Sequence, residues 1–203
     1  MKKTITTALA LLSLASTAFA ATPVMDLASG QTQLGYSYDN LQTNIGTLGD
    51  LGTYHANNYQ LAYGLSDKLA LTGNYLDSGA RSFINGTTNI DNLKFDSTAI
   101  GLQYKVNKNF AVSAGSLKSE LKYDLGTASS SEIFGGIAYK QKFDNNLEGY
   151  ASYLKSSNVE DWKAGLTYNV GSKTSLDVGY HHYQNDGVAV SAKGVGFGVN
   201  HKF

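Results

Sequence analysis

The sequence of 203 residues contains no cysteine, and its one proline, Pro23, lies near the N-terminus. Without cysteine, neither a disulfide framework nor a thiolate metal site can form. The chain also lacks a long apolar run, since no segment after the first twenty residues approaches the roughly 18 consecutive apolar residues that mark a membrane-spanning helix. These absences argue against a disulfide-stabilised domain and against a helical membrane protein.

Neither sign of charge is in excess. Lysine and arginine together number 16, as do aspartate and glutamate. Removal of Lys2 and Lys3 with an N-terminal signal would leave 14 positive against 16 negative side chains, a net charge of −2. A nucleic-acid-binding surface needs an excess of basic residues to neutralise phosphates. The sequence therefore predicts no nucleic-acid partner.

The first twenty residues have the pattern of a cleavable export signal. Lys2 and Lys3 form a short positive region, residues 5–15 are apolar apart from threonine and serine, and Ala18-Phe19-Ala20 is a small-x-small cleavage site. This order is typical of a secretory signal peptide. We expect residues 1–20 to be removed and residues 21–203 to form the mature domain.

Alternation of apolar and other residues is the strongest pattern in the mature chain. In the C-terminal segment, Val195, Phe197 and Val199 alternate with glycines, and the alternation runs to Phe203. A period of two is typical of β-strands that present different faces to different surroundings. Ten candidate strands follow this pattern, at about residues 33–39, 58–65, 69–75, 98–106, 110–115, 133–139, 147–153, 162–170, 175–181 and 194–203.

The strand count and lengths suggest a closed barrel. Each segment can reach the roughly ten residues that a tilted strand needs to cross a bilayer, and an even number of strands places both termini on one side. We therefore predict an all-β fold, an antiparallel up-and-down transmembrane β-barrel of ten strands, with eight strands as the runner-up. The competing interpretation is a soluble secreted sandwich with tyrosines in its core.

Two kinds of connection alternate along the chain. Short turns are expected at 65–69, 106–110, 143–147 and 170–176, and longer loops at 42–53, 78–94, 118–130, 156–160 and 184–189. Aromatic residues concentrate near both sets of strand ends, as in the two aromatic girdles of membrane barrels. Barrels of this kind have periplasmic turns and extracellular loops.

The C-terminal octapeptide Gly-Phe-Gly-Val-Asn-His-Lys-Phe, the signal peptide and the tyrosines near short turns resemble those of bacterial outer-membrane barrels of the porin-like superfamily. The resemblance implies residence in the outer membrane of a Gram-negative-type envelope, in contact with outer-membrane lipid. It also implies recognition by the barrel assembly machinery through Phe197, Val199 and Phe203, with His201 departing from the usual apolar residue.

The inward face of the predicted barrel consists mainly of small and polar residues. Its candidate lumen-lining charges are Asp39, Lys105, Lys140, Glu148, Lys163 and Asp177, with Lys202 at the end of the chain. Buried charges must pair or meet water, so they form either a salt-bridge network or a narrow wet channel.

A ten-strand barrel is only slightly wider than the size that side chains fill. We therefore expect a narrow passive channel for small solutes. The alternative is a closed structural or adhesin-like barrel that acts through its extracellular loops. A segment 78–94 that fills the lumen would favour the alternative.

A catalytic role has little support in the sequence. Some outer-membrane barrel proteases use aspartate and histidine at their rim, and this chain has Asp177, His181, His182 and Asp186. Asp177 and His181 are four residues apart, about 13 Å along a strand, which is too far for a hydrogen bond. Asp161 or Asp77 could come closer from another strand. No Gly-x-Ser-x-Gly motif occurs, and we predict no catalytic residue, metal site or cofactor.

Overall fold

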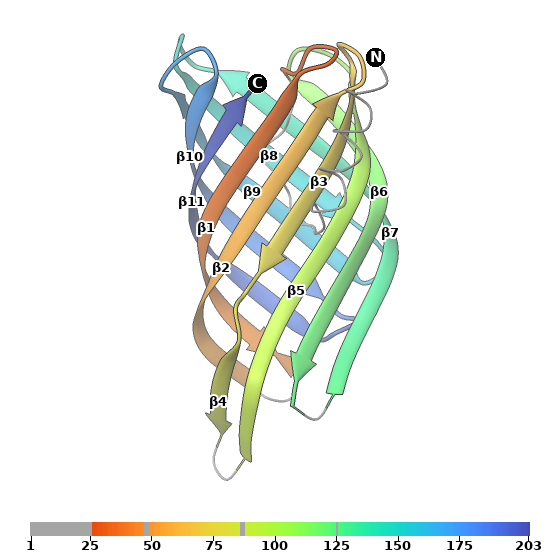
Figure 1. The fold of residues 1–203 in the computed structure, drawn as a ribbon, viewed down its shortest axis with the longest axis vertical. Coiled ribbons are helices and arrows are strands. Elements are labelled where there is room, and N and C mark those ends of the chain that lie inside the picture. The colour runs from red at the N-terminus through yellow and green to blue at the C-terminus, as the bar shows by residue number, and fades with distance from the viewer. Residues whose placement is uncertain (1–25, 47–48, 86–87, 125) are drawn as a thin grey trace.

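The computed structural model describes residues 26–46, 49–85, 88–124 and 126–203 (Figure 1). The predicted signal peptide, residues 1–20, lies outside the described residues. Eleven strands are formed in the described part of the chain. They are β1 (Thr32–Ile45), β2 (Gly49–Gly64), β3 (Leu69–Asp77), β4 (Arg81–Asn85), β5 (Thr88–Lys105), β6 (Phe110–Tyr123), β7 (Gly126–Lys142), β8 (Leu147–Lys155), β9 (Val159–Asn169), β10 (Thr174–Asn185) and β11 (Val190–Lys202).

Ten of these strands close into an antiparallel barrel, and β4 pairs only with the outer part of β5. Each barrel strand pairs with its neighbours in the chain, and β3 pairs directly with β5. The ring closes where β1 pairs with β11, from Gln33 opposite Lys202 to Ile45 opposite Val190. Closure removes the free sheet edges that hydrocarbon does not tolerate. The predicted ten-strand fold is confirmed.

None of the described residues belongs to a helix that is long and apolar enough to cross a membrane.

The four short turns share one hydrogen-bond pattern. In each, a backbone N–H donates to the carbonyl four residues later: Leu65 to Leu69, Val106 to Phe110, Phe143 to Leu147 and Val170 to Thr174, at 2.8–3.1 Å. The last turn is therefore shorter than the 170–176 expected. Phe203 N–H donates to the Thr32 carbonyl at 2.9 Å, so the C-terminus lies at the same end as these turns. We call this the short-turn end and the opposite end the hairpin end.

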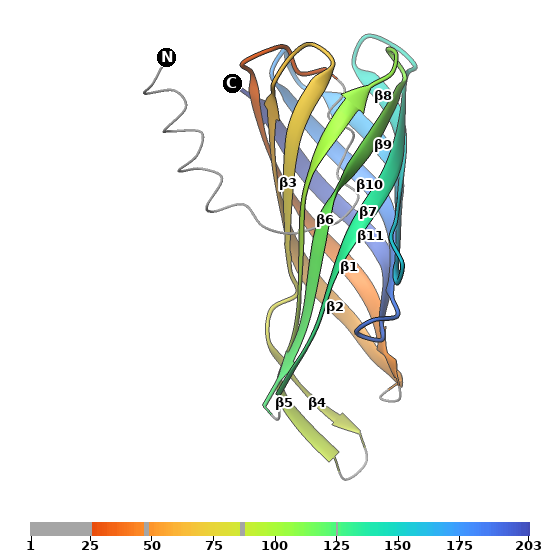
Figure 2. The ribbon, with the colours of Figure 1, turned by 90° about the vertical axis from the view of Figure 1, so that its right-hand side faces the viewer.

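The expectation of long loops at the hairpin end is wrong for most connections. The strands continue through them, so that β6 and β7 are separated only by residues 124–125 and β10 and β11 by residues 186–189. Within 78–94, the described residues 81–85 form β4 and 88–94 form the outer part of β5, rather than a lumen-filling plug. This β4–β5 hairpin leaves the wall and bends across beneath the hairpin end of the barrel (Figure 2).

The outer surface nearest the short-turn end is an apolar band. Outward side chains there include Leu102 and Ile100 on β5 and Val178 on β10, with exposed tyrosines such as Tyr104 and Tyr180. An outward apolar band with aromatic residues is the surface that a barrel presents to lipid. Behind it, the inward positions are small or polar, as the sequence predicts.

Towards the hairpin end the two faces exchange character. On β5, Phe95 and Leu93 are buried inside, while Asp96 and Lys94 point outward. Outside, Asp96 pairs with Lys94 and Lys122, each at 3.1 Å. A wall that is polar outside and apolar inside is the arrangement expected in water. The expectation of a small, polar interior throughout is therefore wrong for this half of the barrel.

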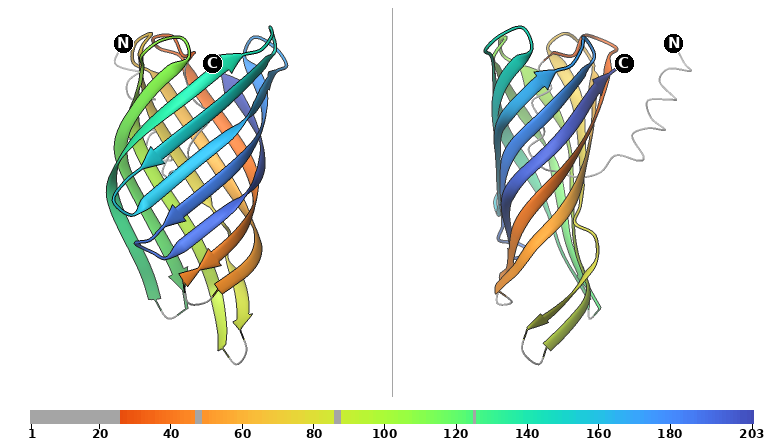
Figure 3. Two further views of the ribbon diagram at one scale, coloured as in Figure 1. Left: turned by 180° about the vertical axis from the view of Figure 1, so that it is seen from behind. Right: turned by 90° about the vertical axis from the view of Figure 1, so that its left-hand side faces the viewer.

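The hairpin end is built as two sheets facing each other. One leaf contains the outer parts of β1, β2, β9, β10 and β11, and the other contains those of β5, β6 and β7 with β4. They diverge as two legs in Figure 2 and in the right-hand view of Figure 3. A continuous apolar cluster, centred between them, consists of Leu41, Ile45, Ala56, Leu76, Leu93, Phe95, Ala99, Leu117, Leu121, Phe134, Leu154, Val159, Tyr183, Val188, Val190 and Ala192. We call the two leaves and this cluster the cap.

Two seams separate the leaves because the paired strands have unequal lengths. β3 pairs with β2 only from Asn57 onward, and β8 pairs with β7 only from Gly135 onward. A side chain bridges each seam. Arg81 donates from Nη1 to the Thr53 carbonyl at 3.0 Å, and Glu132 accepts from the Asn158 backbone N–H at 2.9 Å.

Truncation inside the cap is expected to cost far more stability than truncation on the lipid-facing wall. Leu117, in the cluster, is 1 % exposed, whereas Leu102 on the outer wall is 45 % exposed. Leu117→Ala leaves a cavity and should lower the free energy of unfolding by about 2–5 kcal/mol. Leu102→Ala should cost less than half as much, because lipid fills the vacated space. Urea unfolding in lipid vesicles measures both, and equal losses would contradict a packed cap.

Candidate functional site in the barrel interior

Tyr183 spans the interior of the cap from one leaf to the other. Its hydroxyl, on β10, lies 3.0 Å from the Ser119 hydroxyl of β6, and Ser119 lies 3.1 Å from the Ser97 hydroxyl of β5. The Tyr183 ring packs 5.5 Å from that of Phe95, and its hydroxyl accepts from Asn185 Nδ2 at 2.9 Å. Because strands from opposite walls meet through buried side chains, the lumen is closed at this level.

A cluster of charged side chains lies in the middle of the barrel. His181 Nε2 donates to Asp161 Oδ1 at 2.8 Å, and His181 Nδ1 lies 3.6 Å from Asp39 Oδ2. Beside them, Lys163 Nζ lies 3.4 Å from Asp177 Oδ1. All five side chains are at most 2 % exposed. The cluster links β1, β9 and β10 through electrostatic contacts.

Inward glycines make room for this cluster. A Cβ at Gly196 of β11 would lie 1.8 Å from Asp39 Oδ1, so only glycine lets Asp39 reach past β11 towards His181. On β9 and β10, Cβ atoms at Gly165 and Gly179 would lie 2.6 and 2.4 Å from the Tyr150 hydroxyl. The glycine alternation that marks β11 in the sequence thus provides space for buried charges.

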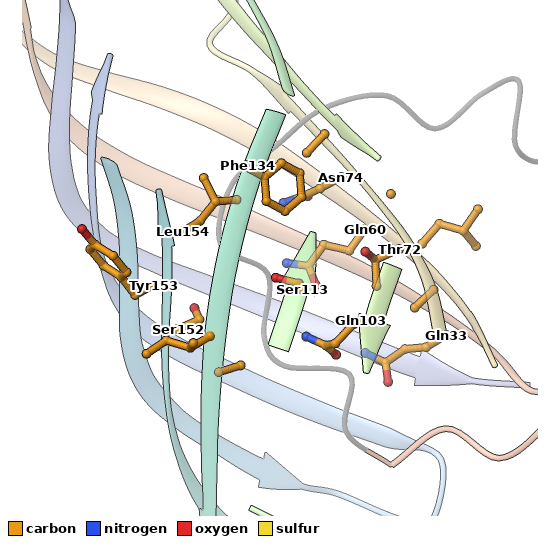
Figure 4. A pocket seen from close by; sticks show the side chains of 16 residues that line it. Gln33, Gln60, Thr72, Asn74, Gln103, Ser113, Phe134, Ser152, Tyr153 and Leu154 are labelled. Carbon is orange, nitrogen blue, oxygen red and sulfur yellow. The ribbon is translucent and has the colours of Figure 1, made fainter. Parts of the chain in front are cut away.

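A small cavity of about 70 Å³, lined by both polar and apolar side chains, lies on the other side of the interior (Figure 4). Gln60, Gln103 and Ser113 lie around it, from β2, β5 and β6, and Phe134 and Leu154 border it. This volume holds a few water molecules at most. Within the cap, the corresponding cavity is only about 20 Å³ and is lined mostly by apolar side chains.

The short-turn end opens into a large polar vestibule of about 670 Å³. Lys140 Nζ pairs with Asp26 Oδ2 at 2.9 Å and also contacts the Glu148 carboxylate. Lys142 Nζ lies 3.5 Å from Glu148 Oε1, and Lys202 Nζ lies 3.4 Å from the Asp26 carbonyl oxygen. Residues 26–31 thus lie against the mouth of the barrel, where Leu27 packs on Ala62.

The predicted interior charges separate into two groups. Asp39, Lys163 and Asp177 meet in the middle of the barrel, together with His181 and Asp161.

Lys140 and Glu148 lie in the vestibule, and Lys105 borders a neighbouring small pocket near Leu27. Asp77 is not a partner of His181 and pairs with Lys94 outside, at 3.2 Å. Sequence reasoning missed Tyr183 as a cross-lumen residue and Asp26 as a vestibule residue, because neither lies in a segment that the alternation predicts to be a strand.

The hydrogen bond between His181 and Asp161 has the length found in catalytic His–Asp pairs, but a substrate cannot reach the two side chains. Both side chains are 1 % exposed and lie beneath the cap. A general base must come within hydrogen-bonding reach of a substrate. The pair therefore serves to hold strands together in this conformation.

Comparison with known proteins gives distant structural similarities. No family model matches the sequence, and no curated protein matches it. The attachment invasion locus protein Ail of Yersinia pestis is 16% identical, with coverage of 86% of this chain and 99% of that one and a TM-score of 0.44.

Two further solved barrels are similar at the same level. Neisserial surface protein A is 14% identical over 88% of this chain and 100% of that one, with a TM-score of 0.45. The N-terminal β-barrel domain of Pseudomonas aeruginosa OprF is 11% identical over 87% and 100%, with a TM-score of 0.42.

The architecture of this chain is that of a small bacterial outer-membrane β-barrel. A closed antiparallel barrel satisfies every ladder hydrogen bond without water, and an apolar outer band faces lipid. Both features are present in the described residues.

Adjacent histidines provide a matched test of the buried cluster. His181→Leu leaves Asp39 and Asp161 without the imidazole between them, and loss of one member of a buried charged group typically costs about 3–5 kcal/mol. His182 points outward and stacks on Trp162 with ring centroids 5.5 Å apart. His182→Leu should cost less than about 1 kcal/mol. Equal unfolding free energies for the two variants would show that the cluster does not hold the strands together.

Asp26 should make stability depend on pH. Burial raises the pKa of the Asp26 carboxyl, but the charges of Lys140, Lys202 and Lys142 and the hydrogen bond from Lys140 outweigh burial, and the pKa falls below 3.8. The carboxylate therefore stabilises the fold above pH 3.8, and this contribution is lost as pH falls through the lowered pKa. The Tm difference between the wild type and Asp26→Asn should shrink over that range, and a constant difference would contradict the assignment.

Proposed function

We propose that the protein is an outer-membrane barrel that is closed to solutes and acts through its surfaces. The observation that carries this proposal is the Tyr183–Ser119 contact across the lumen, within a continuous apolar cluster. Hydrophobic constrictions block ions because water leaves them. A sealed barrel was the alternative to a channel in the sequence-based prediction, and the cap favours it.

The hairpin end offers the surface for such a role. The β4–β5 hairpin extends beyond the barrel, and Phe83 and Ile90 anchor it by packing against the apolar cluster. Its backbone is held by the β4–β5 ladder and by Arg81. A projecting, anchored hairpin is suited to surface contact, as the adhesin-like interpretation requires. The proposal includes no catalytic activity.

In this proposal the short-turn end faces the periplasm and the hairpin end faces the outside. Phe197, Val199 and Phe203 point outward and are exposed, which leaves them accessible to the barrel assembly machinery. Outer-membrane lipid surrounds the apolar band, and the polar outside of the cap extends beyond it into water.

A narrow channel for small solutes is the second candidate. The vestibule of about 670 Å³ and the interior cavity of about 70 Å³ favour it, because both provide space for water. The two functions differ only in whether the cap opens.

Single-channel conductance of the refolded protein in a planar bilayer distinguishes the two. We expect the wild type to be silent. A triple variant truncates three side chains that fill the cap: Phe95→Ala, Leu117→Ala and Tyr183→Ala. It should show discrete current steps, because water can enter the space that these side chains vacate.

The matched control is Ile100→Ala, Leu102→Ala and Val112→Ala on the outer wall, which should stay silent. Reproducible steps from the wild type, with an ion selectivity that changes in Glu148→Gln, would refute the sealed barrel and favour the channel.

A further inference from the structure

The vestibule at the short-turn end carries an excess of positive charge. Four lysines line it, Lys140, Lys142, Lys173 and Lys202, against the two carboxylates of Asp26 and Glu148, for a net charge of +2. The two carboxylates are engaged with Lys140 and Lys142. Among the described residues, neither Lys173 nor Lys202 forms an ion pair. Two cations at the mouth thus remain for an external anion.

The lining of the vestibule indicates a hydrophilic ligand. Besides the lysines, amides and hydroxyls such as Asn146, Asn169, Asn200 and Ser175 surround the space, and none of the described residues that line it is aromatic. Ligand pockets for apolar molecules are lined mainly by hydrophobic and aromatic residues. A molecule that fills this space must therefore form hydrogen bonds over most of its surface.

The chain itself shows which anionic group fits. The Asp26 carboxylate lies 2.9 Å from Lys140 Nζ, and the electrostatic influence of Lys142 and Lys202 also reaches it. Charge-assisted hydrogen bonds between ammonium and carboxylate groups are stronger than neutral ones. Lys202 lines the same space as Lys140 and Lys142, and the repulsion between these like charges is one that a second carboxylate would relieve.

We propose that the vestibule is a binding site for a small hydrophilic polycarboxylate, in which Lys202 and Lys173 bind the carboxylates and Asp26, paired with Lys140, is an internal competitor for the positive charge of the site. The vestibule lies on the opposite side of the charged cluster from the cap. The site therefore takes its ligand from the short-turn end and does not depend on whether the cap opens.

Isothermal titration of the folded protein with citrate in detergent at low salt tests the site. Citrate should bind saturably, and its trimethyl ester, which has the same skeleton without charge, should not. Lys202→Met and Lys173→Met should each weaken citrate binding by about fivefold to tenfold. Lys108→Met, on the turn at 106–110 outside the vestibule lining, should change it by less than about twofold. Salt should weaken binding by screening.

The Asp26→Asn variant distinguishes competition by Asp26 from a purely structural role of this residue, because only competition predicts tighter citrate binding. Removing the competing carboxylate should tighten citrate binding by about fivefold. Heat-modified gel mobility confirms that each variant is folded. Absence of saturable binding, equal affinity for citrate and its ester, or affinities unchanged in both lysine variants would overturn the proposal. An unchanged or weaker affinity in Asp26→Asn would do the same, and tighter binding of inorganic phosphate than of citrate would overturn the carboxylate assignment.

Discussion

The hydrogen-bond ladder between β1 and β11 passes from lipid into water without interruption, and the rest of the structure depends on that constraint. In lipid, the ladder must close on itself, so β1 pairs with β11 along its length. Beyond the lipid, the same ladder continues, but the outer surface must now be polar. The apolar side chains therefore move from the outer to the inner face of the strand while the backbone continues unchanged. On β5, Ile100 lies outside in one half and Phe95 lies inside in the other.

That exchange determines what the interior can do. Where the outside is apolar, the inside can hold charges, and His181, Asp39 and Lys163 are balanced there by close partners in a space cleared by Gly196. Where the outside is polar, the inside becomes a dry core, and Tyr183 joins opposite walls. The interior is thus a sequence of three environments along the axis: a wet vestibule, a charged middle and an apolar cap.

The sequence predicted the lipid-facing half well and the cap poorly, for one physical reason. Alternation identifies the two faces of β5 at Ile100 and Leu102 because all the outward apolar residues in this half of the strand face lipid. Beyond Thr98 the period of two persists, but the apolar residues move to the opposite face. The change of phase therefore resembles the end of a strand, and the pattern places Leu93 in a loop and Phe95 at its border. Long-range pairs such as Asp39 with His181 depend on barrel closure, which sequence spacing does not encode.

The two seams in the cap have a consequence for motion. Each leaf is internally tied by backbone hydrogen bonds, whereas the leaves are joined across the seams by a few side chains, among them Arg81 and Glu132. Backbone amides along an unpaired border, such as residues 50–56 of β2 and 127–134 of β7, open without breaking the barrel ring. Hydrogen exchange there will be fast compared with the closed ring. The seams are therefore the places where the cap loosens first, while the apolar cluster keeps the lumen closed and the membrane-embedded ring remains rigid.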